Sequence, residues 1–224
     1  MICSSYSWGM SDASPTPLSG RRAQAAINDG VILESARAVF TADPSAPIAA
    51  VARHAGVGIS ALYRRYPGKE DLLRTLAADG LQRFIDELEA ALADERDAWT
   101  AFADFMRRAV DANTSSLTQA LAGRFAPTRE MWANGQRSAE LLGELFERTR
   151  AAGALRPDLE VHDLSVIFEQ LAAVRVGDEA RTHQLRQRYL ALMLDAMHEA
   201  GADPLPGPAP TWAEISQRWT ARDT

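Results

Sequence analysis

Five polar side chains of types that bind DNA lie close together in the sequence: Ser60, Tyr63, Arg64, Arg65 and Lys69. Arginine forks bind the acceptor edge of guanine, and both arginine and lysine pair with phosphates. Hydroxyl groups donate hydrogen bonds to phosphate oxygens. These residue types therefore predict contact with double-stranded DNA, provided that one structural element presents them together.

The segment Ile48–Leu72 is expected to supply that element. Four apolar residues recur at the spacing of one helical face: Ile48, Val51, Ala52 and Ala55. Gly56 follows at once, where the end of a helix favours a left-handed residue. A second short helix over residues 59–66 is predicted to bury Ile59 and Leu62. Two short helices joined by a glycine turn indicate a helix-turn-helix, whose second helix enters the major groove of DNA.

The stretches Val51–Gly58 and Leu62–Leu72 resemble the TetR family of bacterial transcriptional repressors. The family pattern runs roughly A-x-x-A-G-V-S-x-G-T-L-Y-x-H-F-x-x-K-E-x-L. With the first helix included, the resemblance covers Arg21–Leu76, about a quarter of the chain. Three residues depart from the pattern: Gly58 replaces a capping Ser or Thr, Ala61 replaces a Thr, and Arg65 replaces a His.

The resemblance implies an all-α fold with an N-terminal three-helix DNA-binding domain and a C-terminal helical domain for ligand binding and dimerisation. It implies that Tyr63 contacts a phosphate and that Tyr66 packs in the core. It also implies a homodimeric repressor that reads a palindromic operator and is released from it by a small-molecule effector. An activator or a ligand-independent regulator of the same fold remains an alternative.

Composition divides the chain into four expected parts. Residues 1–20 are rich in Ser, Pro and Gly and are expected to be a disordered leader. The DNA-binding domain is expected over residues 21–68 and the effector-binding and dimerisation domain over 69–200. Residues 201–224 form a Pro-rich spacer and a short C-terminal helix that begins with a capping box at Thr211. Helical patterns are expected over residues 23–42, 47–55, 59–66, 69–94, 97–112, 115–124, 128–152, 162–177 and 180–200.

Aromatic and methionine side chains are frequent in the expected body. In the family, such helices enclose a ligand cavity, and a lining of this type suits an apolar or amphipathic effector. The effector-binding candidates are Trp99, Phe102, Phe105, Met106, Phe125, Met131, Trp132 and Phe168.

The last two expected body helices have broad apolar faces, and family members dimerise through this pair. A dimer also has a physical advantage, because two recognition helices one DNA turn apart read a palindrome. The dimer-interface candidates are Ile167, Leu171, Leu185, Tyr189, Leu192 and Met193.

Charge is unevenly distributed along the 224 residues. The net charge is −6, yet residues 19–75 carry eight basic and five acidic side chains, which leaves the acidic excess on the body. A basic head on an acidic body is typical of DNA-binding regulators. No apolar run has the ~20 residues of a membrane span. The single cysteine, Cys3, excludes an intrachain disulfide, and a cytoplasmic location without membrane contact is expected.

Catalytic and metal-binding patterns are not found in the sequence. The four histidines lack the spacing of metal ligands, and no nucleophile elbow or phosphate-binding glycine loop occurs. An all-α enzyme with a structural helix-turn-helix is therefore disfavoured, and no cofactor or metal is expected.

Overall fold

The structure, a computed structural model, describes residues 20–112, 125–198 and 203–216, and within these ranges every regular element is a helix. The helices are α1 (Gly20–Ala42), α2 (Ile48–Ala55), α3 (Ile59–Arg65), α4 (Lys69–Leu92), α5 (Ala98–Asp111), α7 (Arg129–Ala151), α8 (Val161–Ala173), α9 (Glu179–His198) and α10 (Trp212–Ser216). The predicted all-α fold is confirmed. The expected leader and the expected helix over residues 115–124 lie outside the described residues.

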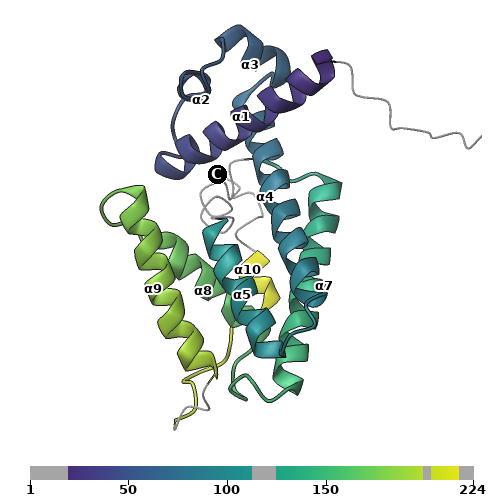
Figure 1. Ribbon diagram of the computed structural model, residues 1–224, viewed down its shortest axis with the longest axis vertical. Helices are drawn as coiled ribbons and strands as arrows, with labels where there is room; N and C mark the ends of the chain where they lie inside the picture. Colours follow the sequence, from purple (N-terminus) through teal and green to yellow (C-terminus); the bar gives the residue numbers. More distant parts are fainter. Residues whose placement is uncertain (1–19, 113–124, 199–202, 217–224) are drawn as a thin grey trace, which may run out of the picture.

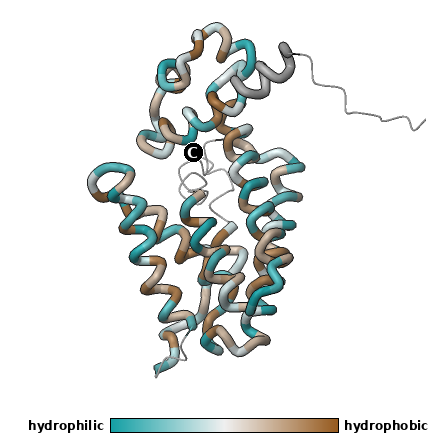
Figure 2. Tube along the Cα trace, in the orientation of Figure 1, coloured by the Kyte–Doolittle hydropathy of each residue, from teal (hydrophilic) through white to brown (hydrophobic). Residues whose placement is uncertain are grey.

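Two apolar cores organise the chain. The first lies among α1, α2, α3 and the start of α4, which form a head at one end of the molecule (Figure 1). The second lies among the lower half of α4, α5, α7, α8 and α9, which form the body. Apolar and polar residues are interspersed along the helices, as amphipathic helices around a core require (Figure 2).

Helix α4 contributes to both cores. Its first two turns place Leu72, Leu73 and Leu76 in the head core. Its last turns place Leu88 and Ala91 in the body core. An α-helix of 24 residues is about 36 Å long, so α4 spans the molecule from head to body.

Ion pairs and hydrogen bonds fix α4 at its middle and at its C-terminal end. Near the head, Arg37 of α1 pairs with Asp79 at 2.6 Å, and the same carboxylate accepts Arg83 at 3.0 Å. At the far end, Arg148 of α7 donates to the carbonyl oxygens of Ala91 and Leu92, both at 2.9 Å. These two carbonyls belong to the last turn of α4, which lacks partners within the helix.

The C-terminal segment returns to the body. Thr211 and Glu214 form the predicted capping box, with the Glu214 carboxylate accepting from the Thr211 amide at 2.7 Å. Ile215 is buried, whereas Trp212 is nearly half exposed, so the apolar face of α10 is only partly covered. Asp158 accepts a hydrogen bond from the Leu205 amide at 2.7 Å and is held by Arg156, which also donates to the Asp203 carbonyl.

Candidate DNA-binding helix and regulatory body

The turn between α2 and α3 has the geometry that the sequence predicts. Gly56 has φ 67° and ψ 24°, which lies in the left-handed region. The amide of Val57 donates to the Ala52 carbonyl at 3.0 Å, and the amide of Gly56 donates to that of Arg53. These two bonds satisfy carbonyls at the end of α2. The turn therefore directs α3 away from α2 as a helix-turn-helix requires.

Helix α3 packs on the head through one fully buried residue, Leu62, and is followed by buried Tyr66. The packing role expected for Tyr66 is confirmed. Ile59 is 40% exposed, so the prediction that it is buried is wrong. Gly58 stands at the N-cap without a side-chain hydrogen bond, as its departure from the family pattern implies.

The remaining side chains of α3 face solvent. Ser60, Tyr63, Arg64 and Arg65 are all exposed, and Tyr63 is 48% accessible. Four of the five predicted DNA-contact residues are therefore presented together on one short helix. Their contacts with DNA stay a prediction.

The two arginines of α3 differ in their surroundings. Arg65 pairs with Asp29 of α1 through two contacts: Nε donates to Oδ1 at 2.9 Å, and Nη2 lies 2.7 Å from Oδ2. This hydrogen-bonded carboxylate raises the pKa of Arg65 above its ordinary value. Among the residues that the structure describes, none pairs with the Arg64 guanidinium. Asp29 lies 36 positions before Arg65 in the sequence, so no local pattern indicated that the two residues pair.

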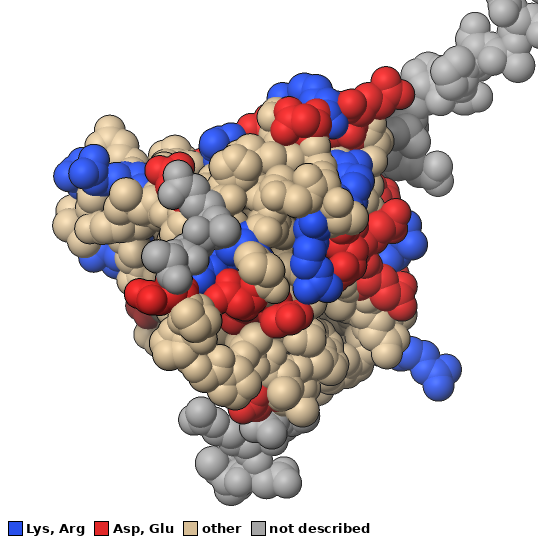
Figure 3. Space-filling view, turned by 90° about the horizontal axis from the view of Figure 1, so that it is seen from below, with Lys and Arg blue, Asp and Glu red and all other residues tan. Residues whose placement is uncertain are grey.

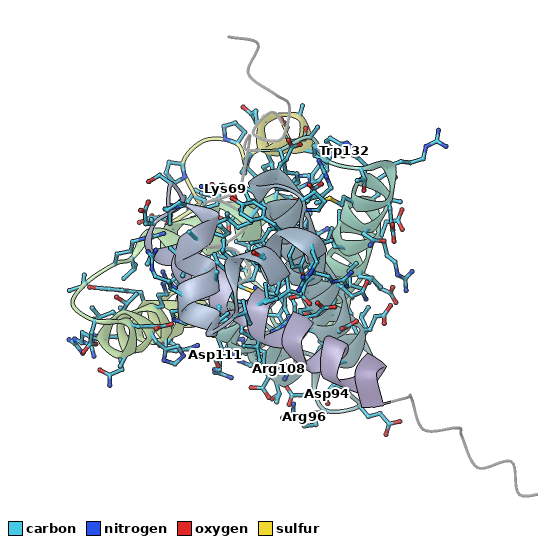
Figure 4. The ribbon with its side chains drawn as sticks, turned by 90° about the horizontal axis from the view of Figure 1, so that it is seen from above. Lys69, Asp94, Arg96, Arg108, Asp111 and Trp132 are labelled. Atoms are coloured by element: carbon cyan, nitrogen blue, oxygen red, sulfur yellow. The ribbon has the colours of Figure 1, made fainter. Side chains whose placement is uncertain are left out.

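Lys69 lies at the first position of α4 and reaches back to the loop between α1 and α2. Its Nζ donates to the carbonyl oxygens of Pro44, Ser45 and Ala46 at 3.3, 3.1 and 2.7 Å. The same ammonium lies 5.1 Å from the centre of the Phe40 ring. Seen from the head end, Lys69 lies beside the head helices (Figure 4). The geometry gives Lys69 a structural role, and its predicted phosphate contact competes with these bonds.

The effector-binding candidates divide between the two cores. Phe102, Phe105, Met106 and Phe168 lie in the body core, with Trp99 packed against it. Phe125 and Met131 instead belong with the head core, and Trp132 is 43% exposed on α7. Five of the eight candidates are thus brought together.

An aromatic cluster stands at the centre of those five residues. Phe105 lies 5.5 Å from Phe84 and 6.3 Å from Phe168, measured between ring centres. Phe84 of α4 was not among the candidates, although it is one of the apolar residues at helical spacing along that helix. Trp99 stacks on His198 of α9, with ring centres 4.2 Å apart. The cluster therefore joins α4 directly to α5 and α8.

The dimer-interface candidates also differ in exposure. Tyr189 and Leu192 are 43% and 57% exposed on α9. Leu171 is buried, and Ile167 and Met193 pack against the core of their own chain. Leu185 is half buried. The apolar surface that one chain leaves exposed here lies mainly on α9.

Charged side chains of both signs lie on the surface of the body. Seen from the end opposite the head, acidic and basic side chains lie interspersed (Figure 3). Arg96, for example, pairs with Asp94 at 2.6 Å and Asp104 at 2.8 Å.

No group of metal-ligating side chains occurs within the described ranges. In the same ranges no helix has the length and apolar character needed to cross a bilayer.

Two family models match the chain and together cover the head and most of the body. The model described as bacterial regulatory proteins, tetR family, matches residues 32–76. The model described as transcriptional regulator SbtR-like, C-terminal domain, matches residues 96–199. The chain belongs to the TetR family of transcriptional regulators. TetR-family proteins are DNA-binding regulators and not enzymes.

Solved structures of other TetR-family regulators share the fold. A TetR transcription regulatory protein from Mycobacterium vanbaalenii is 28% identical with a TM-score of 0.56, over 80% of this chain and 99% of that one. SCO0520 from Streptomyces coelicolor is 25% identical with a TM-score of 0.55, over 78% and 99%. LfrR from Mycobacterium smegmatis, in complex with proflavine, is 21% identical with a TM-score of 0.53, over 77% and 97%. No curated protein matches the chain.

Proposed function

We propose that this TetR-family regulator is a cytoplasmic homodimeric repressor that binds a palindromic operator and is released by an apolar or amphipathic small molecule. The observation that carries the proposal is the exposed set on α3, Ser60, Tyr63, Arg64 and Arg65, set at a left-handed glycine turn. Recognition helices of this kind enter the major groove, and a symmetric dimer presents two of them to a palindrome.

The aromatic cluster supports the effector part of the proposal. Phe84 belongs to α4, the helix that also supplies Leu72 and Leu76 to the head core. A molecule that displaces Phe105 or Phe168 therefore acts on the helix that holds the head. Solved LfrR, which has the same fold, was crystallised with proflavine. The proposed effector site comprises Trp99, Phe102, Phe105, Met106 and Phe168.

Thermodynamic linkage gives the decisive experiment. If the effector weakens operator binding tenfold, the operator must weaken effector binding tenfold, which corresponds to about 1.4 kcal/mol. The effector is titrated with and without operator DNA, with tryptophan fluorescence as the readout. Identical effector affinities in both titrations contradict an inducer role for that molecule. Retention of operator binding at saturating effector favours a ligand-independent regulator.

Matched tryptophan variants locate the bound molecule. Trp99→Phe removes the tryptophan that packs against the body core, and Trp132→Phe removes an exposed one outside that core. Loss of the fluorescence change in Trp99→Phe alone supports a site in the body. Loss in Trp132→Phe alone places the site elsewhere and contradicts the assignment.

A further inference from the structure

The pair between Arg65 and Asp29 links the last residue of the recognition helix to α1. Both carboxylate oxygens contact the guanidinium, at 2.9 and 2.7 Å, which is the bidentate geometry of strong arginine–carboxylate recognition. The Arg65 side chain is 60% exposed and that of Asp29 is 28% exposed. The pair is therefore accessible to solvent at the surface of the head.

A pair in this position contributes little to stability, because solvent screens exposed ion pairs. Its effect on DNA binding is expected to be larger. An arginine that neutralises a phosphate releases a counterion, and this release dominates binding to DNA of any sequence. Arg65 paired with Asp29 carries almost no net charge toward a phosphate. A phosphate must compete with a carboxylate that is already in place.

Hydrogen-bonding capacity leads to the same conclusion. A guanidinium has five N–H donors in a rigid plane. The Asp29 carboxylate engages Nε and Nη2, so three N–H donors remain for DNA, two on Nη1 and one on Nη2. The plane of Arg65 is thus set by α1, whereas Arg64 is not restrained by any described residue.

We propose that Asp29 is a specificity-determining residue, which holds Arg65 against α1 and so limits its pairing with phosphates of non-operator DNA. The inference rests on the proposed entry of α3 into the major groove. It assigns the two adjacent arginines different tasks: Arg64 contacts DNA with its full charge, and Arg65 is restrained. The ratio of operator affinity to random-sequence affinity is higher because of this restraint.

The test uses the full-length protein as wild type, Asp29→Asn, Arg65→Ala and the double variant. Binding to a random-sequence duplex and to the operator is measured between 50 and 200 mM salt. Asp29→Asn is expected to strengthen binding to the random duplex and to steepen the salt dependence by about one unit. The gain over wild type then falls about three- to fourfold across this salt range. In the Arg65→Ala background, Asp29→Asn is expected to change neither quantity.

Three outcomes overturn the proposal. An equal gain in both backgrounds means that Asp29 repels phosphates by itself. Weaker binding by Asp29→Asn means that Asp29 orients Arg65 for a DNA contact. No change means that the pair lies away from DNA. Thermal unfolding of each variant excludes misfolding. Failure of the wild type to bind any duplex contradicts the proposed function itself, whereas wild-type binding with these outcomes contradicts only the role of Asp29.

Discussion

Arg175 donates a hydrogen bond from Nη1 to the carbonyl oxygen of Thr41 at 2.5 Å, across 134 positions of sequence. Arg175 lies in the connection between α8 and α9, and Thr41 lies in the last turn of α1. Figure 1 shows this connection beneath the end of α1. The body therefore contacts the head directly, in addition to its link through α4.

Removal of this contact should loosen the end of α1 without unfolding the protein. Arg175→Ala is expected to change the free energy of unfolding by less than about 1 kcal/mol, because the side chain is exposed. Faster amide hydrogen exchange is expected over residues 41–46. Arg181→Ala, on α9, is the control and should leave this exchange unchanged. The same rate of amide hydrogen exchange over residues 41–46 in both variants contradicts a tether between body and head.

Arg64 is expected to read the operator directly. Arg64→Ala should lower operator affinity by about 1–3 kcal/mol if the side chain reaches a base edge. Gel-shift or anisotropy titrations on operator and random duplexes measure the difference. An equal loss on both duplexes reassigns Arg64 to a phosphate. Arg107→Ala on α5, an exposed arginine of the body, should bind as the wild type does.

Lys69 connects the start of α4 to the loop before α2. Lys69→Ala should lower the free energy of unfolding by about 1–3 kcal/mol, because three carbonyl oxygens lose their charged hydrogen-bond donor. Urea denaturation measures this loss, and Lys69→Arg should reduce it. The salt dependence of DNA binding should change little. A decrease of about one unit in its slope, without loss of stability, would establish a phosphate contact instead.

Substitutions at two leucines on α9 are expected to distinguish an effect on folding from an effect on dimerisation. Leu190 is fully buried, and Leu192 is 57% exposed in the single chain. Leu190→Glu should unfold the protein, since a charge in the core is not compensated. Leu192→Glu should leave the helical content unchanged and yield a monomer by light scattering. A wild-type chain that is a folded monomer at micromolar concentration refutes the proposed dimer.

Asp158 holds the C-terminal segment through Arg156 and the Leu205 amide. These partners lower the pKa of Asp158 to about 2 from its usual 3.8. A lowered pKa means that the carboxylate stabilises the contact above pH about 4 and that this contribution is lost as pH falls toward 2. Asp158→Asn should reproduce that loss at neutral pH as faster proteolysis near residues 203–216. Unchanged cleavage in the variant counts against the clamp.

Local patterns predicted the fold well because they depend on neighbours in the sequence. The left-handed Gly56, the start of α4 at Lys69 and the capping box at Thr211 are all such features. The burial of Ile59 could not be obtained in this way. Helical spacing gives the direction of a side chain, but a neighbouring element decides whether that side chain is covered.

Long-range pairs account for what the sequence could not reveal at the candidate site. Nothing in the spacing of Asp29 and Arg65 indicates that they meet. Their contact depends on how α1 and α3 pack against each other in the head. Phe125 and Met131 are of the residue types that line apolar ligand pockets, yet they pack with the head core. Residue type marks a side chain as suited to an apolar environment, but the choice between two cores depends on tertiary structure.

The shared helix α4 has a consequence for building chimeric regulators. A head cut out at Gly68 loses Leu72, Leu73 and Leu76, together with Phe125. These residues close the core beneath α1 and α2, and their loss exposes apolar surface that the isolated segment cannot cover. The DNA-reading unit is therefore not portable at the boundary of its motif. A transplant between relatives must carry the first turns of α4 and preserve the surface that receives them.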